Sequence, residues 1–96
     1  MKNAPEMNLE ISDSLGGIEL RMWWTTPDDM VLSFVYEIER ARIRRANWPE
    51  GIVRGVIETM CESLRRDYAQ QAGRQPIWDR DAFIKTSVER VLEAAQ

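Results

Sequence analysis

The first quarter of the chain alternates between apolar and polar residues on both sides of a short loop. Apolar residues occupy every second position before and after the segment SDSLGG. A period of two residues is typical of β-strands with one buried face. Gly16 and Gly17 would supply the backbone freedom that a tight turn requires. The pattern predicts a β-hairpin over residues 7–24, with strands near 7–12 and 17–24. The alternative is an irregular arm at 7–12 followed by a single strand.

Two consecutive tryptophans end the second predicted strand. If the alternation continues from Met22, Trp24 faces the core and Trp23 faces the opposite side. Trp24 would then close the core. Trp23 would lie against a neighbour in the sheet or belong to an exposed patch.

The next segment, TTPDD, has the composition of a helix start. Thr26 would be the N-cap, Pro27 would occupy the first helical position, and Asp29 would complete an arrangement similar to a capping box. These signals predict a helix over residues 27–46. Apolar residues cover more than half of its circumference, so we expect it to be central in the domain or buried in an oligomer.

Two further helices are expected after this one. Pro49 suits the first turn of a helix over residues 49–71. An aspartate, Asp79 or Asp81, would cap a last helix over residues 80–95. The predicted fold class is therefore α+β, with an N-terminal β-hairpin followed by three α-helices in a small, helix-dominated domain. Residues 1–6 are expected to be a disordered leader, and residues 7–96 to be a single domain.

Size and composition limit the classes of protein to consider. Ninety-six residues suit one small domain, and 44% hydrophobic and 30% charged residues are ordinary for a globular protein. The formal net charge of −3 predicts no general affinity for nucleic-acid backbones. No apolar run reaches the roughly 18–20 residues of a membrane span, and the N-terminus lacks the apolar core of a secretory signal. A soluble, cytoplasmic protein is expected.

Side chains that commonly perform catalysis or bind metals are scarce. The chain has no histidine, which removes the commonest general base and the commonest metal ligand. Its single cysteine, Cys61, falls beside the apolar face of a predicted helix, so buried packing is expected rather than a nucleophile. The paired aspartates are explained by helix capping. We therefore expect no enzyme activity, no cofactor and no metal site.

Arginines cluster near the end of the helix predicted over residues 27–46. Arg42 and Arg45 continue its core-facing stripe, so that side of the helix ends in two guanidinium groups. They could be solvated or paired within the chain, contact a protein or second subunit, or bind nucleic acid or another anion. Tryptophan and arginine are enriched at interface hot spots. The candidate partner-binding residues are Trp23, Arg21, Tyr36, Arg42, Arg45 and Trp48.

Together these features predict a small non-enzymatic protein-interaction module. It would be a homodimer, because the helix over residues 27–46 is too apolar for one copy to cover, and it would regulate or inhibit a partner protein. Phages and mobile elements often encode such modules. The alternative is a DNA-binding transcriptional regulator, because a strand followed by helices resembles ribbon–helix–helix dimers. Glu19 on the outward side of the strand disfavours that alternative. The expected partners are another protein, a second copy, or both; nucleic acid is less favoured, and no membrane is expected.

Overall fold

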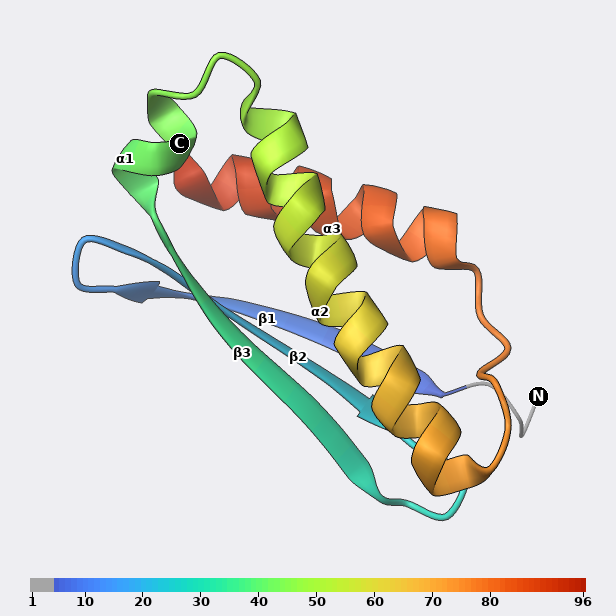
Figure 1. Cartoon of the computed structure of the whole chain (residues 1–96). Coiled ribbons are helices and arrows are strands. Elements are labelled where there is room, and N and C mark those ends of the chain that lie inside the picture. The colour runs from blue at the N-terminus through green and yellow to red at the C-terminus, as the bar shows by residue number, and fades with distance from the viewer. Residues whose placement is uncertain (1–4) are drawn as a thin grey trace.

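The computed structural model describes residues 5–96. Three strands form an antiparallel sheet in the order β1-β2-β3, and the helices follow them in the chain. Both long helices lie on the same face of this sheet (Figure 1). The elements are β1 (Glu6–Ser14), β2 (Gly17–Thr25), β3 (Val31–Glu39), α1 (Arg40–Arg44), α2 (Pro49–Ala72) and α3 (Arg80–Ala95). The small α+β class is confirmed.

The predicted hairpin is present as β1 and β2. The two strands pair antiparallel, with Leu9 opposite Met22, and both extend beyond the predicted bounds. Gly16 adopts a positive φ of 80° in the connecting turn, a conformation that glycine tolerates without steric cost. The alternative of an irregular arm over residues 7–12 is therefore wrong. The predicted leader lies outside the described residues over 1–4, whereas Glu6 already begins β1.

The helix predicted over residues 27–46 is wrong. Residues 26–30 form a turn in which the Thr26 N–H donates to the Met30 carbonyl oxygen at 2.8 Å. The Thr26 hydroxyl oxygen accepts a hydrogen bond from the Met30 N–H at 3.1 Å, so Thr26 caps a turn rather than a helix. Asp29 has a φ of 63°, which no helix interior accommodates. A third strand, β3, follows, and only the five-residue helix α1 remains of the predicted helix.

Tertiary pairing explains this error. The segment VLSFVYEIE satisfies a helical stripe, but it also alternates, and it is rich in β-branched and aromatic residues that favour strands. In the structure β3 pairs along its whole length with β2, with Trp24 opposite Leu32 and Ile18 opposite Ile38. The third strand gives the marginal hairpin a sheet large enough to pack against helices.

The core lies between the inner face of the sheet and the two long helices. Trp24 is 0% exposed and meets Trp78 edge to face, with ring centroids 4.7 Å apart. Trp23 lies on the opposite face of β2, so the predicted split between the two tryptophans is confirmed. The largest fully buried side chains also include Tyr68, Ile18, Leu20, Met22, Ile38, Ile57, Met60, Leu64 and Ile84.

The two later helices agree with the sequence signals. Pro49 occupies the first turn of α2, and Gly73 ends that helix in the left-handed conformation with a φ of 71°. The Asp79 carboxylate accepts a hydrogen bond from the Ala82 N–H at 3.1 Å, so Asp79 is the cap of α3. Residues 5–96 therefore contain two long helices rather than three.

Two glycines should respond in opposite ways to alanine. A Cβ at Gly17 would collide with the backbone carbonyl oxygen of Ile38 on the neighbouring strand, so Gly17→Ala should lower the free energy of unfolding by about 1–3 kcal/mol. A Cβ at Gly55 meets nothing within 4 Å, and Gly55 lies in the interior of α2. Gly55→Ala should therefore stabilise the protein by about 0.5–1 kcal/mol. Urea unfolding of both variants measures this, and an equal loss in both would contradict the close approach at Gly17.

Candidate protein-binding surface

The face of the sheet opposite the helices, here called the open face, is not covered by any element of residues 5–96 (Figure 1). Val31 and Val35 project from it and are 60% and 50% exposed. Together with the partly exposed Trp23 they form a small apolar group on this face. A hollow of about 590 Å³ lies here, lined by Glu10, Arg21, Trp23, Val31, Ser33 and Val35.

Strand register assembles the centre of the open face. Trp23 lies directly opposite Ser33, and the diagonal neighbours on β3 are Val31 and Val35. Diagonal neighbours in an antiparallel pair lie within reach of an aromatic side chain. The small Ser33 side chain leaves room beside the indole. The result is an apolar centre built from β2 and β3.

Acidic side chains lie on two sides of this centre, along β1 and toward the end of the sheet that contains Gly17. Alternation places five glutamates on the open face, against the single arginine Arg21. A guanidinium nitrogen of Arg21 lies 3.6 Å from a carboxylate oxygen of Glu19, so that one positive charge is partly balanced within the face. The glutamates are Glu6, Glu10, Glu19, Glu37 and Glu39. The open face is therefore apolar at its centre and strongly negative at its margin.

The arginine cluster divides into paired and unpaired members. Arg40 donates to the Gly17 carbonyl oxygen at 3.1 Å and forms an ion pair with Asp13. Arg44 donates from Nε to the Ala95 carbonyl oxygen at 3.1 Å. Within residues 5–96, Arg42 and Arg45 form no ion pair. Only part of the cluster is therefore explained by contacts within the chain.

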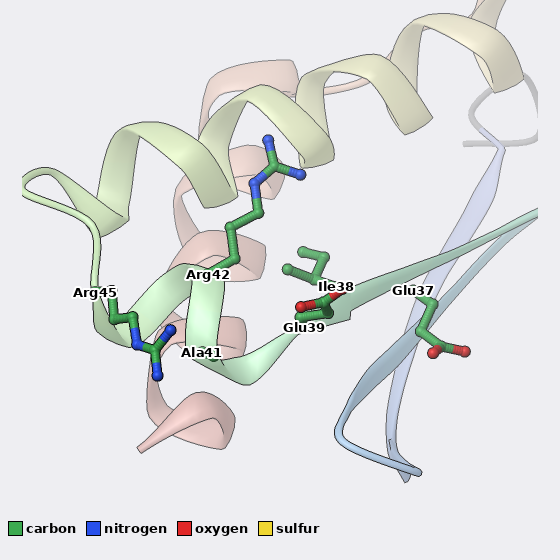
Figure 2. A pocket seen from close by; sticks show the side chains of 6 residues that line it. All are labelled: Glu37, Ile38, Glu39, Ala41, Arg42 and Arg45. Atoms are coloured by element: carbon green, nitrogen blue, oxygen red, sulfur yellow. The ribbon is translucent and has the colours of Figure 1, made fainter.

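The unpaired arginines border a second hollow, at the carboxyl end of β3. It has a volume of about 360 Å³ and is lined by Glu37, Ile38, Glu39, Ala41, Arg42 and Arg45. Figure 2 shows the Arg42 side chain extending toward α2, while Arg45 points away from that helix. Carboxylates and guanidinium groups thus lie at the same end of β3.

The predicted candidate residues fall into separate places. Arg21 and Trp23 lie together on the open face. Tyr36 lies on the inner side of β3, beside a groove that also contains Arg42, whereas Arg45 ends α1. Trp48, 69% exposed, precedes α2 and packs near Gly51.

Sequence reasoning missed the contribution of β3 to the open face. Val31, Ser33, Val35 and Glu37 were assigned to a helix, which would have separated them from the hairpin. The signal that could have found them is the alternation of β3, in which every second residue faces the core.

The thiol of Cys61 is not placed for chemistry. Cys61 is 1% exposed, and its Sγ lies 3.8 Å from the Sδ of Met22. Burial raises the pKa of this thiol from its ordinary value of 9.0 to about 12, so the thiol stays protonated near neutral pH. The predicted buried packing is confirmed.

Neither a metal cluster nor a membrane-spanning helix is found in the part of the chain that the structure describes. No group of three or more Cys, Asp or Glu side chains within residues 5–96 is arranged to hold a metal ion. Over the same residues, no helix is both long and apolar enough to cross a bilayer.

Neither a family model, nor a curated protein, nor a solved structure matches this chain.

Proposed function

We propose that this chain is a non-enzymatic protein-interaction module that binds its partner on the open face of the sheet. The observation that supports this most is the apolar centre of Trp23, Val31 and Val35 inside a margin of carboxylates. Tryptophan at the centre of a surface with a polar margin is the typical arrangement of an interface hot spot.

The charge of the open face indicates the chemistry of the partner. Five glutamates against one arginine would attract a segment that carries lysine or arginine together with apolar side chains. Apolar contact on Trp23 would supply most of the affinity, and the carboxylates would supply orientation and a faster association rate. By covering such a segment, the module would regulate or inhibit the protein that contains it.

The DNA-binding alternative fits this surface less well. Proteins that read DNA with strands need basic side chains near the phosphates. Here the exposed side of the sheet is acidic, and the helix once expected after the hairpin is a strand. A protein partner is therefore the better proposal.

Selection from a displayed library of random peptides tests the proposal. The immobilised full chain should enrich peptides of net positive charge that contain aromatic or aliphatic residues. Trp23→Ala should weaken binding of a selected peptide at least about tenfold, because truncation removes the centre of the surface. Trp48→Ala is the matched control, since Trp48 is exposed elsewhere, and it should leave binding unchanged.

A charge variant provides the second arm of the test. Glu37→Lys should weaken the same peptide, and the loss should shrink at high salt because exposed charges are screened. Glu93→Lys, an exposed position on α3, is its control. Enrichment of acidic peptides, or equal effects of Trp23→Ala and Trp48→Ala, would contradict the proposed surface.

A further inference from the structure

Both edges of the sheet lack a partner strand within residues 5–96, and β3 forms one of them, because it pairs with β2 on one side only. Figure 1 shows β3 at the outer margin of the molecule. An edge strand that is long and uncharged readily pairs with another strand. Natural proteins usually protect such edges with charges, proline or a bulge, and the first six residues of β3, VLSFVY, contain none of these.

The turn before β3 determines which backbone groups face outward. The Thr26 N–H donates to the Met30 carbonyl oxygen, and the Met30 N–H points back to the Thr26 side chain, so residues 26 and 30 form a hydrogen-bonded pair. Hydrogen-bonded and non-hydrogen-bonded pairs alternate along an antiparallel ladder. With this register, the even-numbered residues of β3 bond to β2. The backbone groups of Val31, Ser33, Val35 and Glu37 therefore point to the open edge.

Apolar side chains flank this open edge on both faces. Val31 and Val35 are exposed on the open face. Leu32, Phe34 and Tyr36 on the inner face are only partly buried against the core. A strand added at this edge would cover apolar surface on both sides of the sheet, and would satisfy backbone groups that now face solvent.

Charge complementarity identifies the strand that would fit. Asp28 and Asp29 are exposed before the start of β3, and Arg42 and Arg45 are exposed beyond its end, after Glu37 and Glu39. With Val35 at the two-fold axis, all nine residues of β3 pair antiparallel with their copies. The turn that contains Asp28 and Asp29 then lies at the same end of the paired strands as α1 of the second copy, where Arg42 and Arg45 form no ion pair within residues 5–96.

We propose that two copies of this chain associate through β3, antiparallel about a two-fold axis perpendicular to the sheet. Their sheets then join into one six-stranded sheet with all helices on the same face. A two-fold axis parallel to the strands would instead pair the two copies of β3 in parallel and place the two sets of helices on opposite faces. It would also leave Phe34 of one copy beside the open face of the other.

A groove of about 340 Å³ lies beside this edge, between β3 and α2, and its lining includes Tyr36 and Gly55. By contrast, the opposite edge, β1, carries Glu6, Glu10 and Asp13, and these charges disfavour pairing there. This self-association goes beyond the proposed partner binding and does not depend on it.

Sedimentation equilibrium of the full chain, from low micromolar to near-millimolar concentration, measures the association. Ser33→Pro removes an outward N–H that does not bond to β2. Proline is tolerated on an edge strand, so the sheet should persist. Dimer affinity should fall at least about tenfold, because the second copy loses a hydrogen-bond donor. Ser33→Val keeps the N–H and should remain dimeric. A wild type that stays monomeric throughout, or equal association of both variants, would overturn the proposal.

A charge exchange outside β3 tests the register of the proposed pairing between the two copies of this strand. Asp28→Arg alone should weaken the dimer, because it places a positive charge at the same end of the paired strands as Arg42 and Arg45 of the second copy, and the double variant Asp28→Arg with Arg42→Asp should restore it. This arm remains decisive if Ser33→Pro fails to fold. If Asp28→Arg associated as strongly as the wild type, the antiparallel pairing about Val35 would be excluded. The peptide-binding test of Trp23 is independent of both arms.

Discussion

Replacing Trp24 with alanine should lower the free energy of unfolding by about 3–5 kcal/mol, the range found when a large buried aromatic side chain is truncated. Trp24 is 0% exposed, and it lies between the sheet and the Trp78 ring. A chain of 96 residues has a small core, so this loss is a large fraction of its total stability. Urea unfolding followed by far-ultraviolet circular dichroism measures the change.

Trp23→Ala is the matched control, since it removes the same side chain from the adjacent position on the opposite face. Its effect on stability should stay within about 1 kcal/mol, because its side chain lies outside the core. Trp24→Phe should cost less than alanine, since it keeps an aromatic ring and removes an indole N–H that has no hydrogen-bond partner within the described residues. Equal losses in the two alanine variants would contradict the assignment of faces.

Alkaline pH should destabilise the protein through Cys61. The pKa of the buried thiol is raised to about 12 from its ordinary value of 9.0, so the folded state holds its proton at pH values where the unfolded state releases it. This contribution to stability is complete below pH 9 and is lost as pH rises between 9 and 12. The expected slope is about 1.4 kcal/mol per pH unit, or about 2–3 kcal/mol two pH units above the ordinary pKa.

Cys61→Ala separates this thiol from the other groups that titrate at high pH. The difference in unfolding free energy between wild type and Cys61→Ala should be constant near neutral pH. Above pH 9 the wild type should lose stability relative to Cys61→Ala. A thiol-reactive dye should label Cys61 in urea but not in the folded protein. A pH-independent difference would show that burial does not hold the proton.

Local patterns in the sequence predicted most of the architecture. The alternation about Gly16, the first turn at Pro49 and the cap at Asp79 each depend on residues close in the chain, and the structure bears out all three. The opposite orientations of Trp23 and Trp24 followed from the same alternation.

The failure over residues 27–46 came from a conflict between local and tertiary preferences. Thr26, Pro27 and Asp29 are favoured at a helix start, but they are equally suited to a turn, and Asp29 tolerates the positive φ found there. The alternation and the β-branched residues of VLSFVYEIE compete with its helical stripe, and pairing with β2 decides between the two states. Since Val31 and Val35 depend on that pairing, half of the open face was assigned to the wrong element.

Both proposed surfaces depend on residues 31–39 forming an edge strand whose outer flank is open. Residue-resolved amide exchange at two protein concentrations tests this directly. Amides of Leu32, Phe34 and Tyr36 should exchange slowly at both concentrations, because they bond to β2. Those of Val31, Ser33 and Val35 should exchange fast in dilute solution and slowly when concentrated. Uniform protection at both concentrations, without alternation, would contradict the assignment of an open edge strand, and fast exchange of the outward amides at both concentrations would contradict the association of two copies through β3.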